Sequence, residues 1–396
     1  MAYLQTYPHQ NAAIRSFSIE SELILFDDFS KELALLNQTA SEIWNLHRKK
    51  LSVDEITKCL SKRYGLLEEE IISDVALIFE EWLNLGFIGD KIIANDLSDD
   101  KKLFSLKYKS RVNIDKLKNL HCGSFQYLDS SFCINASSVS ILKIIIPIIS
   151  HLRETGSSSN THEVTIHEVG NRFEFVKLGK VLATCDSLNE IAPIINAFIL
   201  ITGYQEADNL SVFHAGAISD DNGVVLLSGS PGSGKSTLVA ALMCLGKKVF
   251  TDEVSILTHD KKIRPAPGVI GLKEGSWDVI EGFLPSITAM PIHLRQDDKV
   301  VKYIQPCNLL NNNQLKYGEP VKAIVFPVYS QEFDTHIEKI SSAEALVRLT
   351  KAGYYTSQTL STNTVTELIA WIHDIPAFEL QINDLKSAAD LVAELL

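Results

Sequence analysis

The chain has 396 residues, of which 45% are hydrophobic and 22% are charged, and its formal net charge at pH 7 is −12. This length allows two or three domains with cores of their own, and the composition is that of an ordinary globular protein. The acidic balance argues against a nucleic-acid partner, because phosphate backbones are bound by an excess of Lys and Arg.

The most apolar stretches argue against a membrane-spanning segment. Residues 141–152 and 191–201 are both shorter than the ~20 apolar residues that a spanning helix needs. The first residues lack the basic segment and apolar core of a secretory signal. The six cysteines form no C-x-x-C pair, which is typical of a cytosolic thiol protein and not of a zinc site. We expect a cytoplasmic protein with no membrane partner.

Residues 1–95 predict a small α+β domain. Short strands are expected at residues 23–26 and 33–36, and Phe87-Ile88 predicts a closing strand. Capping-box patterns predict that two helices begin near Thr39 and Ser52, and that the second ends near Gly65. A third helix is expected over residues 68–85, stopped by Gly86.

Residues 96–205 predict an intermediate α+β region, and the stretch at residues 95–102, where it begins, is a candidate for a charged linker. Strands are expected over 125–134 and 164–178 and helices over 139–153 and 187–201, but no motif of chemistry is visible. Residues 206–396 predict the nucleotide-binding domain, with a later strand at 322–328 and helices at 341–351 and 383–396.

Residues Gly229–Ser236 contain every fixed position of the P-loop pattern G-x-x-x-x-G-K-[ST]. An apolar run at 224–227 precedes them and a helix-like run at 236–245 follows, which is the context that the motif requires. A Gly-rich turn without a ligand is the alternative. We expect the loop to bind ATP with Mg²⁺ through backbone N–H groups and side chains, using Gly229, Ser230, Pro231, Gly232, Ser233, Gly234, Lys235, Ser236 and Thr237.

An acidic pair, Asp252 and Glu253, ends the short strand 248–251 one helix after the P-loop. A carboxylate there can hold Mg²⁺, and its neighbour can accept a proton from an attacking hydroxyl. Without the P-loop, a solvated acidic turn would be the better interpretation. His214 lies in an apolar strand before the P-loop. Two interpretations stay open for it, a histidine of the core and a catalytic histidine.

Four segments follow one another in the chain: Phe213–Ala215, Gly223–Leu227, the P-loop and Val249–Glu253. Their order resembles the HPr serine kinase/phosphorylase family, whose core is related to the ATP-dependent phosphoenolpyruvate carboxykinases. The family usually has two aspartates after this last strand, and here the second of the two positions is Glu253. It also often forms ring-like oligomers, so a homo-oligomer stays open.

The resemblance implies a role for each residue of the constellation. Asp252 would be the base that activates a substrate serine, with His214 as its partner. Lys235 would act on the phosphates, and Ser236, Asp252 and Glu253 would face Mg²⁺.

Residues 263–273, which are Pro-rich and end in Leu-Lys, resemble the divergent kinase-like branch and not the bifunctional HPr kinase/phosphorylases. Arg264 and Lys273 are candidate phosphate or substrate contacts, because phosphoryl transfer needs cationic stabilisation. Arg295 and Lys302 are weaker candidates of the same kind. Ordinary exposed basic residues are the alternative for all four.

Three segments of the N-terminal domain, Leu36–Trp44, Leu51–Ile56 and Trp82–Ile88, resemble PqqD-type domains. Such winged-helix domains bind the leader of a ribosomally made precursor peptide, which adds a strand beside the N-terminal strands and lies against the third helix. A DNA-binding winged helix is the alternative, and the acidic run Glu68–Glu70 disfavours it. Trp44 and Trp82 are expected in the core.

These patterns together predict a multidomain fold with α/β and α+β parts, in which a small winged-helix-like domain precedes a P-loop HPr-kinase-like domain. The expected function is ATP-dependent phosphorylation of a Ser or Thr hydroxyl on a precursor peptide whose leader the N-terminal domain holds. Two alternatives stay open. One is a kinase of a small molecule or carrier protein, and the other is a non-catalytic ATP-binding chaperone or regulator.

Overall fold

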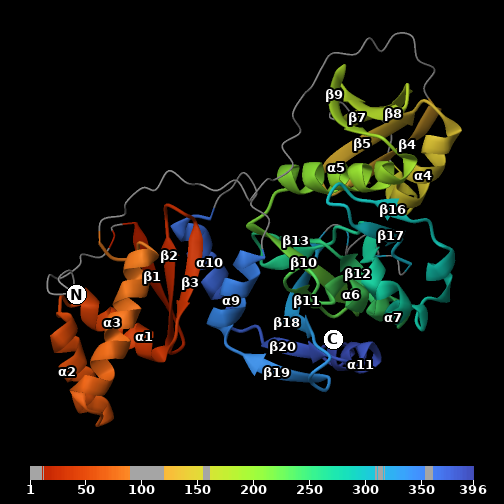
Figure 1. The fold of residues 1–396 in the computed structure, drawn as a ribbon. Helices are drawn as coiled ribbons and strands as arrows, with labels where there is room; N and C mark the ends of the chain where they lie inside the picture. The colour runs from red at the N-terminus through yellow and green to blue at the C-terminus, as the bar shows by residue number, and fades with distance from the viewer. Residues whose placement is uncertain are drawn as a thin grey trace. The chain divides into compact units, whose positions relative to one another are not determined.

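A computed structural model describes residues 11, 13–89, 120–154, 161–307, 310, 315, 317–352 and 360–396, and the predicted linker at 95–102 lies outside them. The chain divides into two compact units, and Figure 1 shows their elements. The first unit comprises residues 1–102, 341–351 and 359–374, and the second comprises 103–340, 352–358 and 375–396. The sequence predicts three consecutive domains at 1–95, 96–205 and 206–396. The two units differ from these ranges because segments distant in sequence pack together.

The first unit is built on an antiparallel sheet in the order β1-β2-β3. Trp44 and Trp82 lie in its core, as predicted. The expected strands and helices are confirmed, whereas β1 was not predicted and Ile88 forms a single bridge instead of a closing strand. The elements are β1 (Ile14–Ile19), β2 (Glu22–Asp27), β3 (Glu32–Leu36), α1 (Gln38–Arg48), α2 (Val53–Tyr64), α3 (Glu68–Asn84), α9 (Ser342–Lys351) and α10 (Thr362–Ile372).

The helix ends of this unit follow local hydrogen bonding. The capping box that begins α2 joins Ser52 and Glu55, and the helix ends at Gly65 with φ of 69°. The predicted cap of α1 at Thr39 is wrong, because the Asn37 side chain accepts the backbone N–H of Ala40 instead. In each case a side-chain oxygen satisfies an N–H that the first helical turn leaves unpaired.

The sheet of the first unit is covered on both faces. Leu23 and Leu25 of β2 pack into the core formed with α1, α2 and α3. Ile24 and Phe26 are fully buried and point to the opposite face, because side chains alternate along a strand. Helix α9 packs on β2 and β3, and α10 packs on β1 and α9. Two helices from late in the chain therefore cover the second face.

Within the described ranges, the second unit has a large sheet in the order β11-β10-β13-β14-β18-β20-β19, in which β12 also pairs with β10 and β11 with β18. A small sheet in the order β15-β17-β16 accompanies it. The strands are β10 (Ser211–Ser219), β11 (Val224–Ser228), β12 (Lys248–Thr251), β13 (Val254–Leu257), β14 (Lys262–Arg264), β15 (Ile270–Lys273), β16 (His293–Leu294), β17 (Val300–Ile304), β18 (Glu319–Tyr329), β19 (His336–Ile340) and β20 (Ala377–Ile382). The helices are α6 (Lys235–Cys244), η4 (Glu274–Ser276), α7 (Trp277–Glu281), η5 (Pro285–Ala289) and α11 (Leu385–Ala393).

The intermediate region forms a further sheet in the order β6-β4-β5-β7-β8-β9, against which α4 and α5 lie (Figure 1). Its core continues into Val212 of β10 and Ile256 of β13, so the region packs on the large sheet of the second unit. No helix of the described chain is both long and apolar enough to cross a membrane. The elements are β4 (Leu120–Tyr127), β5 (Ser130–Ala136), α4 (Val139–Ile149), β6 (Arg153–Glu154), β7 (Thr161–Val169), β8 (Arg172–Lys177), β9 (Lys180–Cys185), η3 (Leu188–Glu190) and α5 (Ile191–Glu206).

Candidate functional site

Strand β10 brings the predicted site residues together. Along one edge it pairs with β11, which leads into the P-loop, and Ala215 lies opposite Ser228. Along its other edge it pairs with β12 and β13 in succession, so His214 lies opposite Val254. The Asp252–Glu253 turn joins β12 to β13 and therefore lies across β10 from the P-loop.

The P-loop forms the turn between β11 and α6. Gly232 and Gly234 have φ of 93° and 90°, which are left-handed values that favour glycine. A Cβ at Gly229 would lie 2.8 Å from Ser233 Oγ. That Oγ is itself buried and has no hydrogen-bond partner among the described residues. A buried, unpartnered hydroxyl inside the loop fits a site that a bound phosphate completes.

The remaining loop residues frame the start of α6. Ser230 and Pro231 are exposed at the tip of the loop, and Thr237 is half-buried in the first turn of the helix. Lys235 is 7% exposed, and its Nζ donates a hydrogen bond of 3.4 Å to the carbonyl oxygen of His214. Burial lowers the pKa of Lys235, and the two carboxylates of the acidic turn oppose this shift.

Asp252 is a buried carboxyl group with one open oxygen. Its Oδ2 accepts a hydrogen bond of 3.4 Å from the backbone N–H of Gly271 on β15, and its buried Oδ1 has no hydrogen-bond partner in the described part of the chain. Burial, followed by the charge of Glu253, raises the pKa of Asp252 to about 7, against the opposing effects of Lys235 and a hydrogen bond from Ser236. A carboxylate with a pKa near neutral is suited to accept a proton from a hydroxyl.

The same pair of residues fits Mg²⁺ by its donor chemistry. The Ser236 hydroxyl acts to lower the pKa of Asp252, and hard oxygen donors are the ligands that Mg²⁺ prefers. The carboxylate of Asp252 and the hydroxyl of Ser236 are donors of this kind. Across the residues that the structure describes, no group of three or more His, Cys, Asp or Glu side chains could hold a metal ion.

His214 lies among a carboxylate and several basic side chains. Burial, followed by the charge of Lys235, lowers the pKa of His214 to about 4. Lys273 and Arg295 add to this effect, and Glu253 opposes it. The imidazole is therefore neutral at pH 7. The structure thus brings Lys273 and Arg295 to the surroundings of His214, whereas the partnership of His214 with the predicted base stays a prediction.

Three tyrosines that the sequence analysis did not single out lie within electrostatic range of Glu253. Burial, and then the charge of Glu253, raises the pKa of Tyr127, Tyr204 and Tyr303. Tyr127 lies on β4 and Tyr204 on α5, so side chains of the intermediate region lie within electrostatic range of Glu253. No local motif marks these residues, because each comes from a different part of the chain.

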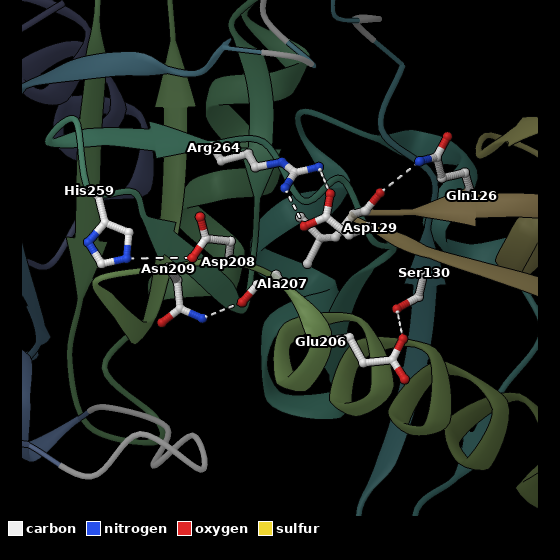
Figure 2. Close-up of polar contacts among 10 residues, drawn as sticks. Gln126, Asp129, Ser130, Glu206, Ala207, Asp208, Asn209, His259 and Arg264 are labelled. Carbon is white, nitrogen blue, oxygen red and sulfur yellow. Dashed lines mark hydrogen bonds and ion pairs between the residues drawn. The ribbon is translucent and has the colours of Figure 1, made fainter. Parts of the chain in front are cut away.

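Arg264 is engaged in an ion pair within the fold, and its predicted phosphate contact stays a prediction. Figure 2 shows its guanidinium facing Asp129 in the β4–β5 turn, with two N···O distances of 2.7 and 2.8 Å. The pair ties β14 to the intermediate region, and the hydrogen bond lowers the pKa of Asp129. Lys302 is likewise engaged within the fold, since its Nζ donates to the carbonyl oxygen of Ile287 and lies 4.3 Å from the ring centroid of Trp277.

Comparison with known proteins bears most directly on the first unit. A structure of TbiB1 in complex with the TbiA(beta) leader peptide is similar at 18% identity and a TM-score of 0.20, over 21% of this chain and 96% of that one. The HPr(Ser) kinase/phosphatase from Coxiella burnetii is similar at 14% identity and a TM-score of 0.20, over 46% of this chain and 92% of that one. No curated protein matches the chain. The family model described as coenzyme PQQ synthesis protein D (PqqD) matches residues 22–88, which run from β2 through α3, so this part of the first unit is a PqqD-like domain.

Proposed function

We propose that this protein is an ATP-dependent kinase that phosphorylates a Ser or Thr hydroxyl of a ribosomally made precursor peptide. One observation carries the proposal. Asp252, with its pKa raised to about 7 and one oxygen unpartnered, lies across β10 from a complete P-loop. This arrangement supports proton transfer from a hydroxyl close to a bound phosphate chain.

Each part of the site then has a task. The P-loop amides and Lys235 hold the phosphates, and Ser236, Asp252 and Glu253 hold Mg²⁺, which supplies neutralisation of the phosphate charge. Asp252 accepts the proton of the substrate hydroxyl at its open Oδ1. Lys273 lies close enough to shift the pKa of the site histidine, so it can stabilise charge on the transferred group.

The PqqD-like domain supports a peptide as the substrate. Strand β3 ends the sheet of the first unit, and an extended leader can add a strand at such an edge. Holding the leader raises the effective concentration of the segment to be modified at the kinase site. This step explains why a phosphotransferase would carry a peptide-binding domain in the same chain.

Incubating the full-length protein with ATP, Mg²⁺ and a Ser- or Thr-containing precursor peptide that it binds is expected to add about 80 Da per phosphate, the mass of one HPO₃ group. Mass spectrometry of the intact peptide and its fragments provides the measurement. If the mass of the peptide does not change and a small molecule or carrier protein gains the phosphate, the protein is a kinase of that substrate and not of the peptide. Slow ATP turnover without any phosphorylated product would favour the non-catalytic chaperone or regulator.

The pH profile of the reaction is expected to report Asp252. The base must be deprotonated, so the rate should fall as the pH drops below about 7, the pKa that burial and Glu253 give this group. Glu253→Gln removes a negative neighbour, which lowers the pKa of Asp252 and moves the acidic limb of kcat/KM to lower pH. Glu274→Gln, which changes an exposed residue after β15, serves as the matched control. An acidic limb at the same pH in the Glu253 variant would contradict the assignment.

A further inference from the structure

A groove of about 610 Å³ follows the outer edge of β3. Four consecutive residues, Glu32–Leu35, line it. Because neighbouring side chains on a strand point to opposite faces, a cavity lined by all four follows the edge of the sheet and not one face. Among the described strands β3 pairs with β2 alone, so the backbone groups on this edge are placed to pair with an extended segment.

Helix α9 forms a second wall of this groove. Its residues Glu344, Val347, Arg348 and Lys351 line the cavity. They are spaced three and four apart, so they share one helical face. The helix spans Ser342–Lys351, far outside the matched residues 22–88. The groove is therefore completed by a part of the chain that the PqqD-like domain itself does not contain.

The two walls differ in charge. Glu32 of β3 and Glu81 of α3 make the PqqD-like side acidic, whereas Arg348 and Lys351 make the α9 side basic. The carboxylate of Glu344 lies 2.5 Å from a guanidinium nitrogen of Arg348, one helical turn away, which fixes the guanidinium along the helix. A peptide between the walls gains from an acidic side chain only where it faces α9.

We propose that α9 is a specificity element, which recognises an acidic side chain in a peptide held in extended form along β3. The inference rests on the proposed function, in which the PqqD-like domain holds a leader. It goes further because it assigns part of the recognition to residues 344–351. In the chain, helix α9 directly follows β19, a strand of the large sheet that also contains β11 before the P-loop. The helix that recognises the leader is therefore covalently joined to the unit that carries the P-loop.

A displayed library of random peptides, selected against the full-length protein, tests the proposal. The wild-type protein should enrich peptides with an acidic residue at a fixed spacing from an apolar one. Lys351→Glu should reduce that acidic preference about tenfold, since opposite charges become like charges across the groove. The double variant E344R/R348E keeps the ion pair within the helix but moves the positive charge by one turn, so the preferred acidic position should shift along the peptide. Lys58→Glu, on an exposed position of α2, is the matched control.

The outcomes separate the two proposals. Selection of the same peptides by the wild type, Lys351→Glu and the double variant would overturn the role of α9 and leave peptide binding by the PqqD-like domain intact. Failure of the wild-type protein to enrich any peptide would overturn leader binding itself and the inference with it. A changed preference in the groove variants, with unchanged selection by the Lys58 variant, supports α9 as the specificity element.

Discussion

Asp252→Asn is expected to retain ATP binding and to lose phosphoryl transfer by a factor of about 10²–10⁴, which is the usual contribution of a positioned general base. The amide keeps the shape of the carboxyl group but cannot accept the substrate proton. Because the native group is buried and its carboxylate is disfavoured there, a neutral replacement should not destabilise the fold. ATP affinity by calorimetry and phosphopeptide formation by mass spectrometry measure the two effects separately.

The matched control is Asp260→Asn, which changes an exposed carboxylate in the turn between β13 and β14. It should leave both ATP binding and transfer unchanged. Normal phosphopeptide production by the Asp252 variant would contradict its assignment as the base. Loss of ATP binding together with transfer would instead show that Asp252 acts through the nucleotide and its metal ion.

The local structure around the candidate site could be predicted from the sequence because its signals are local. The P-loop lies within eight residues between one strand and one helix, and Asp252 follows the next strand. Gly232 and Gly234 adopt the backbone that the motif requires. In the first unit, Ser52 and Glu55 form the capping box that their spacing predicts.

The rest could not be predicted because it depends on contacts between distant segments. The ion pair of Arg264 with Asp129, which is 135 residues earlier in the chain, has no signal in the sequence around either residue. The tyrosines near Glu253 come from three separate elements, so no spacing identifies them. Helix α9 was expected at residues 341–351, yet its amphipathic pattern does not reveal that the face it covers belongs to β2 and β3.

Helices α9 and α10 lie within what would otherwise be a simple hairpin of the second unit. Strands β19 and β20 pair antiparallel, with Ile340 directly opposite Ala377. A short turn could connect these two positions, yet residues 341–376 intervene, and both helices belong to the first unit. The two helices that cover the second face of the first unit's sheet therefore come from a segment inserted between two paired strands of the second unit.

Residues 103–396 expressed alone are accordingly expected to aggregate. The fragment would expose the apolar face that α9 and α10 turn toward β1, β2 and β3. Leu346, Leu349, Leu368 and Ile372 are fully buried in the intact chain. At about 1.5–3 kcal/mol for each large apolar side chain, exposure of several of them approaches the 5–15 kcal/mol, roughly, that stabilises a whole domain. Size-exclusion chromatography and the thermal midpoint provide the measurements.

Co-expression of residues 1–102 as a separate fragment should restore a soluble complex, because it supplies the sheet that covers these helices. Phe26→Asp in that fragment should abolish the rescue, since it places a carboxylate on the buried face of β2 opposite the PqqD-like core. Lys58→Glu, on an exposed position of α2, should leave the rescue intact. A monomeric 103–396 fragment with the thermal midpoint of the full chain would show that α9 and α10 do not need the N-terminal sheet. Rescue that Phe26→Asp abolishes would show that the PqqD-like domain and the P-loop unit are interleaved in the chain and cannot be separated at a single linker.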